Sequence, residues 1–431
     1  MKRRPSKFQQ RPPERFRGAR VVSLPAERMK RRSHMFGLMF LTFIALLMAQ
    51  SVLAGPREQA KRIHDRIAGV PPTAAVLDAM AADITAGNPN AAAQRAIDNP
   101  DFYRTTLKNW ITPWTNFDGT IFDTLNDYSA TVIGMIRDDS DFREILSADV
   151  LYVGNAGLNL PAYSNTSNAH YEALEDQAID LQANLVATTQ SAVTGLQASA
   201  TAGIMTTRAA AKGFFIDGTN RAMLRFTLMN HLCRDLEQVK DITRPPDRIR
   251  QDVTRSPGGD SRIFLNNCVG CHSGMDPLAQ AFSYYEFEHA ENDPEGDSGQ
   301  LRYNAPGMLD PVTGTRVQQK YLINANNFQY GFATPDDAWE NYWRQGQNKL
   351  LGWDETLPGS GNGAKSLGQE LAHSDAFAIC QVEKVFKAMC LREPGNTADR
   401  NQVTSMLASF RANNHNIKQV FIESAVYCMG D

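Results

Sequence analysis

Residues 377–390 read FAICQVEKVFKAMC, a stretch whose apolar side chains recur at three- and four-residue steps along one face of a helix. Two further stripes of the same kind follow in residues 403–410 and 417–428. The segments Pro394-Gly395-Asn396 and Asn413-Asn414 separate the three stripes, and these residue types end helices. The sequence therefore predicts a C-terminal region of three helices that pack along their striped faces.

Four of the six cysteines stand far apart in the sequence. Cys380 and Cys390 lie on one predicted helix, where a rise of about 1.5 Å per residue separates them by roughly 15 Å, too far for a disulfide. If the three helices run up, down and up, Cys390 and Cys428 fall at the same end of the bundle. We therefore predict a Cys390–Cys428 disulfide, which leaves Cys380 for Cys233, with buried free thiols as the alternative.

The rest of the chain also favours helices. Thr73 stands as an N-cap before an Ala-rich run, and an apolar stripe predicts a helix over residues 120–136. We expect a short helix at residues 142–146 and a longer one at residues 221–236. Residues 151–157 suggest a loop, and strand signals are sparse throughout, so the predicted fold class is mainly α.

Composition divides the chain into four parts. Residues 1–54 form a predicted signal peptide with an over-long start, and residues 55–215 form an expected N-terminal helical domain. Residues 216–365 contain a closely spaced cysteine pair, and residues 366–431 contain the three-helix region. The Gly/Asp/Pro-rich stretch 293–363 is too long for a bare connection, which indicates that it wraps a site.

The first part of the chain has the pattern of an export signal. Basic residues at 30–32 precede the nearly unbroken apolar run Met35–Ala49, and Val52-Leu53-Ala54 follows as a cleavage pattern. A start at Met29 would give a signal of ordinary length. An uncleaved anchor is the alternative, because residues 36–54 are marginally long enough to span a membrane. We expect a periplasmic or otherwise exported protein with no transmembrane segment in the mature chain.

The formal net charge of −3 hides an asymmetry along the chain. Residues 1–34 carry twelve Lys or Arg and two Glu, a balance of +10, so the remaining residues sum to −13. Binding to nucleic acid needs a basic face that neutralises phosphates, and the sequence after residue 34 shows none. We therefore expect no nucleic-acid partner.

The pattern Cys268-Val269-Gly270-Cys271-His272 is C-x-x-C-H, the attachment sequence of a c-type haem. The thiols of Cys268 and Cys271 add across the two haem vinyl groups, and the helical turn between them matches the spacing of those groups. His272 then places an imidazole nitrogen on the iron as the proximal ligand. We expect one covalent haem c, which makes residues 216–365 a haem c-binding domain with a long wrapping loop.

A zinc site and a redox-active dithiol are the alternative interpretations of this motif. A zinc site would need a second pair of ligands with similar spacing, and the other four cysteines offer no C-x-x-C. A redox-active dithiol would be expected in a βαβ context, which the sequence lacks. Export also favours haem, because haem is attached to such motifs only after the chain crosses the membrane.

A sixth iron ligand would come from outside the C-x-x-C-H motif. Met275 follows His272 by three residues on the same side of the helix, so it cannot reach the other face of the haem. Met308, in a turn-forming stretch, is the predicted sixth ligand, and a thioether there would raise the reduction potential. An open iron is also compatible with the sequence, and four histidines are competing donors: His231, His289, His373 and His415.

The haem segment Cys268–Leu278, CVGCHSGMDPL, resembles that of planctomycete-type exported cytochrome c proteins, in which Asp-Pro-Leu shortly follows C-x-x-C-H. Residues 203–208 (GIMTTR) and 377–394 are similar to the segments before and after the haem region of that family. Ala279 departs from the family, which often has Gly there, and residues 286–330 match no pattern of it. The resemblance implies adjoining domains of unknown function around a single haem c, and electron transfer without an established substrate.

An exported mono-haem c-type cytochrome that transfers single electrons is the function that these features favour. Its partners would be the cytochrome c maturation machinery and a redox protein. Because the mature chain is acidic, we expect the redox protein to be basic and the complex to be weak and sensitive to salt. A haem-dependent oxidoreductase, peroxidase-like or oxygen-activating, is the first alternative, although no residue set identifies its chemistry. A haem-containing sensor or binding protein is the second.

Overall fold

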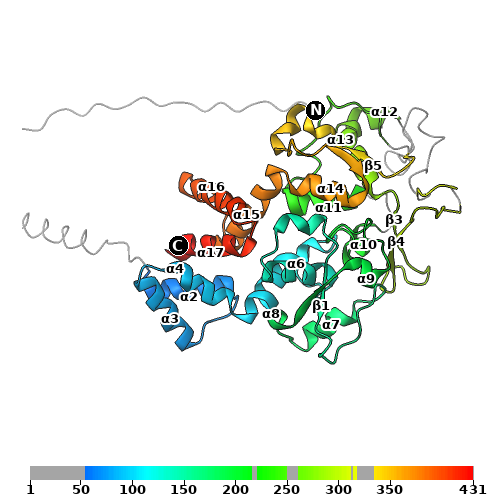
Figure 1. Cartoon of the computed structure of the whole chain (residues 1–431). Helices are drawn as coiled ribbons and strands as arrows, with labels where there is room; N and C mark the ends of the chain where they lie inside the picture. Colours follow the sequence, from blue (N-terminus) through cyan, green and yellow to red (C-terminus); the bar gives the residue numbers. More distant parts are fainter. Residues whose placement is uncertain (1–53, 216–220, 250–260, 312–313, 318–333, 431) are drawn as a thin grey trace, which may run out of the picture. The chain divides into compact units, whose positions relative to one another are not determined.

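The computed structural model describes residues 54–215, 221–249, 261–311, 314–317 and 334–430, which belong to one compact unit. Helices make up most of its elements and the strands are short, so the predicted mainly α fold class is confirmed (Figure 1). The predicted export signal lies outside the described residues.

Three helices begin the described chain: α2 (Pro56–Ile67), α3 (Ala74–Thr85) and α4 (Pro89–Ile97). The side chain of Thr73 accepts a hydrogen bond from the Val76 N–H, which confirms the predicted N-cap of α3. Apolar side chains of α2 and α4 pack against one another and against α17 (Ile417–Tyr427), far along the sequence. Figure 1 shows this meeting of blue and red helices.

Helix α6 (Asp127–Arg137) lies in the core and is buried along nearly its whole length. It starts at Asp127 because Asn126 and Ser129 form a capping box, in which each side chain accepts the other residue's N–H at 3.0 Å. Phe122, which the predicted stripe places on the buried face, is 88% exposed. The expected helix over residues 120–136 is therefore wrong in its first turns.

Three antiparallel two-stranded sheets accompany the helices. The first pairs β1 (Leu151–Gly154) with β2 (Leu185–Thr188), with Leu151 opposite Thr188. The loop expected at residues 151–157 is thus wrong for β1. The other sheets pair β3 (Tyr285–Glu288) with β4 (Gln300–Tyr303), and β5 (Ala338–Glu340) with β6 (Ser360–Asn362).

The C-terminal region contains the three predicted helices, α15 (Asp375–Cys390), α16 (Thr397–Ala412) and α17. Disulfides join Cys390 to Cys428 and Cys233 to Cys380, with Cα–Cα distances of 5.4 and 5.3 Å. Both predicted pairings are confirmed, and the alternative of four free thiols is wrong.

The Cys233–Cys380 disulfide explains why a predicted helix ends early. Helix α11 (Arg221–Thr227) continues as a π-helical turn, η4 (Leu228–Leu232), and Cys233 then takes the left-handed conformation with a φ of 52°. The expected helix over residues 221–236 therefore ends at Leu232. A non-glycine residue in this conformation is held by its surroundings, here by the bond to α15.

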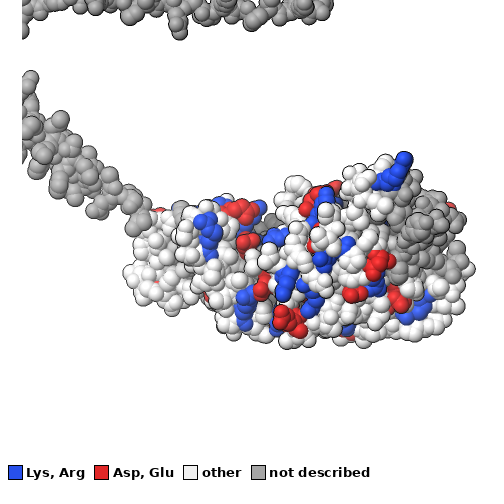
Figure 2. All heavy atoms as spheres, turned by 90° about the horizontal axis from the view of Figure 1, so that it is seen from above, with Lys and Arg blue, Asp and Glu red and all other residues white. Residues whose placement is uncertain are grey.

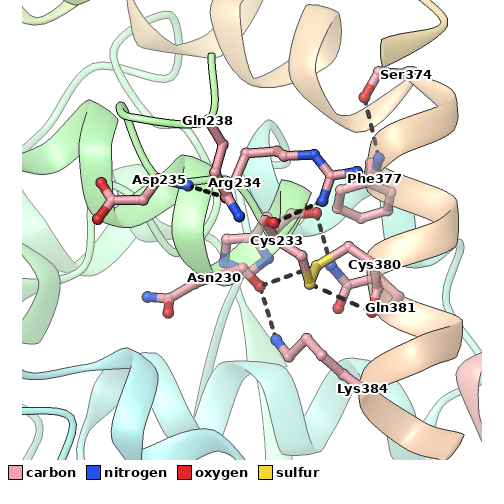
Figure 3. The surroundings of a disulfide bond; sticks show 11 residues. Asn230, Cys233, Arg234, Asp235, Gln238, Ser374, Phe377, Cys380, Gln381 and Lys384 are labelled. Atoms are coloured by element: carbon pink, nitrogen blue, oxygen red, sulfur yellow. Dashed lines mark hydrogen bonds between the residues drawn. A yellow bond between two sulfur atoms is a disulfide. The ribbon is translucent and has the colours of Figure 1, made fainter. Parts of the chain in front are cut away.

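Side chains of α15 also satisfy the last carbonyl groups of η4 (Figure 3). Gln381 donates a hydrogen bond to the carbonyl oxygen of His231 at 3.0 Å, and Lys384 donates to that of Asn230 at 2.7 Å. Carbonyl groups at the end of a helix lack partners within the helix. Helix α15 thus supplies both the covalent and the polar contacts that fix the end of η4.

The other helical segments are shorter or connect these parts. The expected helix at residues 142–146 is confirmed as a 3₁₀ turn, η3 (Phe142–Leu146). The remaining segments are η1 (Phe102–Leu107), α5 (Lys108–Ile111), η2 (Thr112–Trp114), α7 (Ala169–Asp176), α8 (Leu181–Asn184), α9 (Gln190–Thr194), α10 (Arg208–Phe214), α12 (Ser261–Ile263), η5 (Phe264–Cys268), α13 (Val269–Ala279), η6 (Gln280–Phe282), η8 (Tyr342–Arg344), η9 (Gly346–Leu351), α14 (Gly363–Ala372) and η10 (Cys428–Gly430).

The described residues also show whether a helix could span a membrane and how charges are distributed on one face. Within the described ranges, no helix has both the length and the apolar character to cross a membrane. On the face drawn in Figure 2, Lys and Arg side chains lie interspersed with Asp and Glu. Neither sign of charge dominates the described part of that face.

Candidate functional site

The C-x-x-C-H motif lies where two helical segments join. Cys268 is the last residue of the π-helical turn η5, and α13 carries Cys271 and His272 in its first turn. The step of three residues places the two cysteines on one side of the helix. π-helical turns are frequent at functional sites, so the local backbone is compatible with a functional role for this segment.

Both motif cysteines are free thiols with partly exposed side chains, while the other four cysteines form disulfides. The Cys271 Sγ lies 3.6 Å from the carbonyl oxygen of Leu236, and burial raises the pKa of this thiol. A redox-active dithiol needs the opposite, a lowered pKa that gives a reactive thiolate. The surroundings of Cys271 therefore do not favour the dithiol interpretation.

His272 faces a carboxylate of its own helix. Its Nδ1 atom lies 3.1 Å from both carboxylate oxygens of Asp276, one turn further on. Because an ionised carboxylate only accepts hydrogen bonds, we assign the proton to Nδ1, which leaves the lone pair of the neutral ring on Nε2. A carboxylate that orients a histidine through one ring nitrogen is a common partner of metal-binding histidines.

Asp276 is itself fixed from a second helix. Its side chain is completely buried, and Arg221, the first residue of α11, donates to both carboxylate oxygens at 2.8 Å. Burial by itself would raise the pKa of Asp276, but the charge of Arg221 and the His272 ring hold that pKa well below its usual range. Asp276 is thus an ionised acceptor that connects α11 to the motif histidine.

Two glycines let neighbouring segments approach the motif helix closely. A Cβ atom at Gly270 would lie 2.8 Å from the side chain of Lys240, and one at Gly274 would overlap the indole ring of Trp343. The N–H of Asp241 donates to the carbonyl oxygen of Gly270 at 2.9 Å. Helix α13 is therefore packed tightly on two sides, which fixes the position of the residues it carries.

The predicted sixth ligand, Met308, lies in a turn after β4, and its side chain is 55% exposed. Its N–H donates to the carbonyl oxygen of Ala305 at 3.0 Å, which closes the turn. A ligand on haem iron lies against the porphyrin, so this exposure adds no support for Met308. Its role stays a prediction.

The four competing histidines make different local contacts. His231 is buried, and its Nε2 lies 3.0 Å from the hydroxyl of Tyr128. The other three place Nδ1 near an oxygen of a neighbouring residue: His289 (Asp293 O, 2.8 Å), His373 (Gln369 O, 2.8 Å) and His415 (Asp141 Oδ1, 3.7 Å). These are contacts that structural histidines make, and none of them tests iron ligation.

The main hydrophobic core contains three aromatic residues that follow the motif, Phe282, Tyr285 and Phe287, while Tyr284 packs in a separate small cluster with Val317. The rings of Phe282 and Tyr285 pack against Phe215 with centroid distances of 5.7 and 6.1 Å. The Tyr285 hydroxyl donates to the carbonyl oxygen of Ala200 at 2.5 Å. The side chain of Phe264, which precedes the motif, lies outside the described side chains. The described aromatic groups thus have a packing role that does not depend on haem.

Sequence reasoning does not place Asp276 and Arg221 in the site. The step of four residues between His272 and Asp276 could have indicated the first contact, because residues with that spacing face each other on a helix. Arg221 lies 55 residues away from Asp276, and no local spacing points to this pair.

Neither a cluster of metal-binding side chains nor a similarity to known proteins gives further information about the site. Across the described ranges, no group of three or more His, Cys, Asp or Glu side chains could hold a metal ion. A haem c site does not use such a group, because it needs two thiols and one protein imidazole. No protein-family model, no curated protein and no solved structure matches the chain. The resemblance to exported cytochromes c therefore stays a prediction.

Proposed function

We propose that the protein is an exported mono-haem c-type cytochrome that transfers single electrons. One observation carries the proposal: two free thiols stand one helical turn apart, next to an imidazole whose Nδ1 is held by a buried carboxylate. Cys268 and Cys271 would hold the porphyrin through thioether bonds, and His272 would bind the iron through Nε2. The donor set present is the one that a covalent haem requires.

Bound haem c supplies an iron that alternates between the ferrous and ferric states. Asp276 and Arg221 would position and polarise the proximal ligand, His272. Asp276 accepts a hydrogen bond from the Nδ1–H group of His272 and so fixes both the tautomer and the orientation of the ring. The carboxylate also makes the imidazole a stronger electron donor, which favours the ferric state, while Arg221 keeps Asp276 ionised.

A haem-dependent oxidoreductase is the second candidate, and the same carboxylate favours it. An electron-rich proximal ligand promotes cleavage of the O–O bond in haem enzymes. A peroxidase-like or oxygen-activating reaction would require an open sixth position on the iron. A haem-containing sensor or binding protein is a further alternative, which no described contact favours.

The proposal includes the location and partners of the protein. The signal pattern in residues 1–54 supports periplasmic or other export, after which the maturation machinery would attach the haem. The charge balance of the chain after residue 34 supports a basic redox partner and no nucleic acid.

Mass spectrometry of the protein exported from cells that make the haem attachment machinery tests the proposal. We expect the unchanged chain to carry the mass of one haem, and the Cys268→Ala/Cys271→Ala variant to carry none. The matched control is Cys390→Ala/Cys428→Ala, which also removes two cysteines but lies outside the motif, and it should keep the haem. An unchanged chain without added mass would refute the proposal.

Optical spectra of the haem-loaded protein distinguish the carrier from the oxidoreductase. A ferric charge-transfer band in the red that disappears in Met308→Ala would support the carrier with thioether ligation. A high-spin ferric spectrum that shifts when cyanide is added would support the oxidoreductase. In either case Asp276→Asn should make the reduction potential more positive, because the imidazole loses its anionic partner.

A further inference from the structure

A wide polar cleft lies between the loop over residues 115–126, helix α10 and the loop over residues 294–297. Its volume of about 840 Å³ is near the upper end of the range for small-molecule sites, roughly 300–1,000 Å³. None of its lining residues belongs to the motif helix α13. The cleft is therefore a separate feature, which the proposed electron transfer does not use.

An exposed aromatic ring forms one part of the lining. Phe117 is 62% exposed, and its ring packs on Phe226 with a centroid distance of 4.8 Å. Phe226 in turn stacks on Phe214 at 4.5 Å, and both of these rings are buried. Two buried rings thus support the exposed ring, which offers a fixed apolar surface at a polar cleft.

Carboxylate groups outnumber cationic groups in the polar part of the lining. The carboxylates of Asp123, Glu172 and Glu295 form no ion pair in the described structure. Thr124 and Ser167 also line the cleft. A ligand that donates several hydrogen bonds would match this surface, whereas an anionic ligand would be repelled.

The two cationic residues of the lining are already engaged. Lys212 forms a salt bridge with Asp297. The buried guanidinium of Arg208 donates to three backbone carbonyl groups of the 294–299 segment: those of Gly296 (3.2 Å), Asp297 (2.6 Å) and Gly299 (2.9 Å). These contacts tie the loop to α10 and leave little positive charge to attract an anion.

Contacts at its N-terminal end also fix α10, which forms one wall of the cleft. The buried carboxylate of Asp127 accepts the backbone N–H groups of Arg208 at 2.6 Å and Ala209 at 3.0 Å. Thr207 caps the same helix through its side chain. A wall held in this way is organised before any ligand arrives, which reduces the entropy lost on binding.

We propose that this cleft binds a neutral oligosaccharide. The apolar C–H face of one sugar ring would stack on Phe117, and sugar hydroxyl groups would donate to Asp123, Glu172 and Glu295. Sugars combine these two properties, an apolar ring face and a rim of hydroxyl donors, and carry no charge that the carboxylates would repel. The volume admits more than one sugar ring, so an oligosaccharide fits better than a monosaccharide.

Isothermal titration calorimetry on the full exported chain tests the proposal. The probes are cellohexaose, xylohexaose and mannohexaose, with trigalacturonate as an anionic comparison. We expect at least one neutral probe to bind and trigalacturonate to bind at least tenfold more weakly. Phe117→Ala and Glu172→Gln should each weaken binding of the neutral probe about tenfold or more.

Phe122→Ala is the matched control, because Phe122 lies in the same loop and is more exposed but does not line the cleft. It should leave the affinity within twofold, and thermal unfolding should show that all variants are folded. The haem-free Cys268→Ala/Cys271→Ala variant should bind as tightly as the unchanged chain, which separates this test from that of the haem proposal. The inference is overturned if no neutral probe binds at millimolar concentration, if trigalacturonate binds best, or if Phe122→Ala weakens binding as much as Phe117→Ala.

Discussion

At the scale of single residues, Asp276 combines complete burial with an arginine and a histidine as direct neighbours. Removing one partner of a buried ion pair leaves the other charge uncompensated in a medium of low polarity. The side chain of Arg221 is only 15% exposed, so water cannot fully replace the lost carboxylate. Asp276 should therefore matter for stability whether or not haem is bound.

Asp276→Asn is expected to lower the free energy of unfolding by about 3–5 kcal/mol, as measured by urea denaturation. Asp235→Asn is the matched control, because Asp235 accepts the same pair of hydrogen bonds from Arg225, at 2.8 and 2.7 Å, but the two side chains are only partly buried, with 35% and 40% exposed. An ion pair that solvent reaches contributes about 1 kcal/mol or less. Equal losses in the two variants would contradict the importance given to burial.

The stabilisation by Asp276 should also depend on pH. Because its pKa is lower in the folded than in the unfolded chain, the unfolded state binds more protons and stability rises with pH. The contribution is complete above the unfolded pKa, about 3.9, and declines below it. The stability difference between the unchanged chain and Asp276→Asn should stay constant from pH 7 to 5 and shrink from pH 4 to 2. A difference that did not change at low pH would argue against a depressed pKa.

At the scale of elements, α15 fixes the end of η4 through three residues on one side of the helix, Cys380, Gln381 and Lys384 (Figure 3). The ammonium group of Lys384 also lies 3.1 Å from the centre of the Trp114 ring. Burial lowers the pKa of Lys384 well below its usual value, although the aromatic ring and the Asn230 carbonyl oxygen favour a positive charge.

Lys384→Met tests whether the pKa of Lys384 is lower in the folded than in the unfolded chain. With a pKa that is lower in the folded chain, the unfolded state binds more protons, so the lysine form gains stability as pH rises from 7 towards the unfolded pKa of about 10.4. Relative to Lys384→Met, the unchanged chain should gain up to about 1.4 kcal/mol per pH unit in urea unfolding.

Lys387→Met is the control for Lys384→Met, because Lys387 lies on the same helix, is mostly exposed and pairs with Glu393. It should show no such gain between pH 7 and 10. If the two variants responded to pH alike, the lowered pKa of Lys384 would be wrong.

The elements that could be predicted from the sequence are those specified by local spacing. The stripes of α15, α16 and α17 set both the helices and the ends at which Cys390 and Cys428 meet. The predicted helix over residues 120–136 begins too early. The apolar stripe extends before Asn126, but the capping box at Asn126 starts α6 at Asp127.

The features that could not be predicted depend on residues far apart in the sequence. Strand β1 pairs with β2 across the thirty residues 155–184, and the helix from Arg221 stops where Cys233 bonds to Cys380. In the candidate site, the motif itself is local, whereas the Arg221–Asp276 pair forms only when α11 packs on α13. These three features depend on packing between distant segments, which a short stretch of sequence does not specify.

At the scale of the whole molecule, helix α2 joins the beginning of the compact unit to η10. Arg62 donates to the carbonyl oxygen of Met429 at 2.8 Å, and Arg66 donates to that of Cys428 at 2.9 Å. Together with the Cys390–Cys428 disulfide, these contacts connect α2, α15 and η10. The unit is thus closed by residues from opposite parts of the sequence.

Arg62→Ala/Arg66→Ala should lower the free energy of unfolding by about 3–6 kcal/mol, because each of the two lost hydrogen bonds from a charged donor contributes about 1.5–3 kcal/mol. Hydrogen exchange should become faster in α2 and in residues 417–430. Arg57→Ala/Lys61→Ala, which removes two exposed basic side chains from the same helix, should change stability by less than about 1 kcal/mol. A loss of equal size in the control would show that net charge, and not the closure, is responsible.

The contact of α2 with residues 428 and 429 has a consequence for the order of assembly. A polypeptide is synthesised from its N-terminus, so α2 is made long before the carbonyl groups to which it docks. These contacts can therefore form only when the last residues of the unit have been made. Until then α2 lacks two of its partners, and a chain that stops before residue 428 should be cut more readily by proteases.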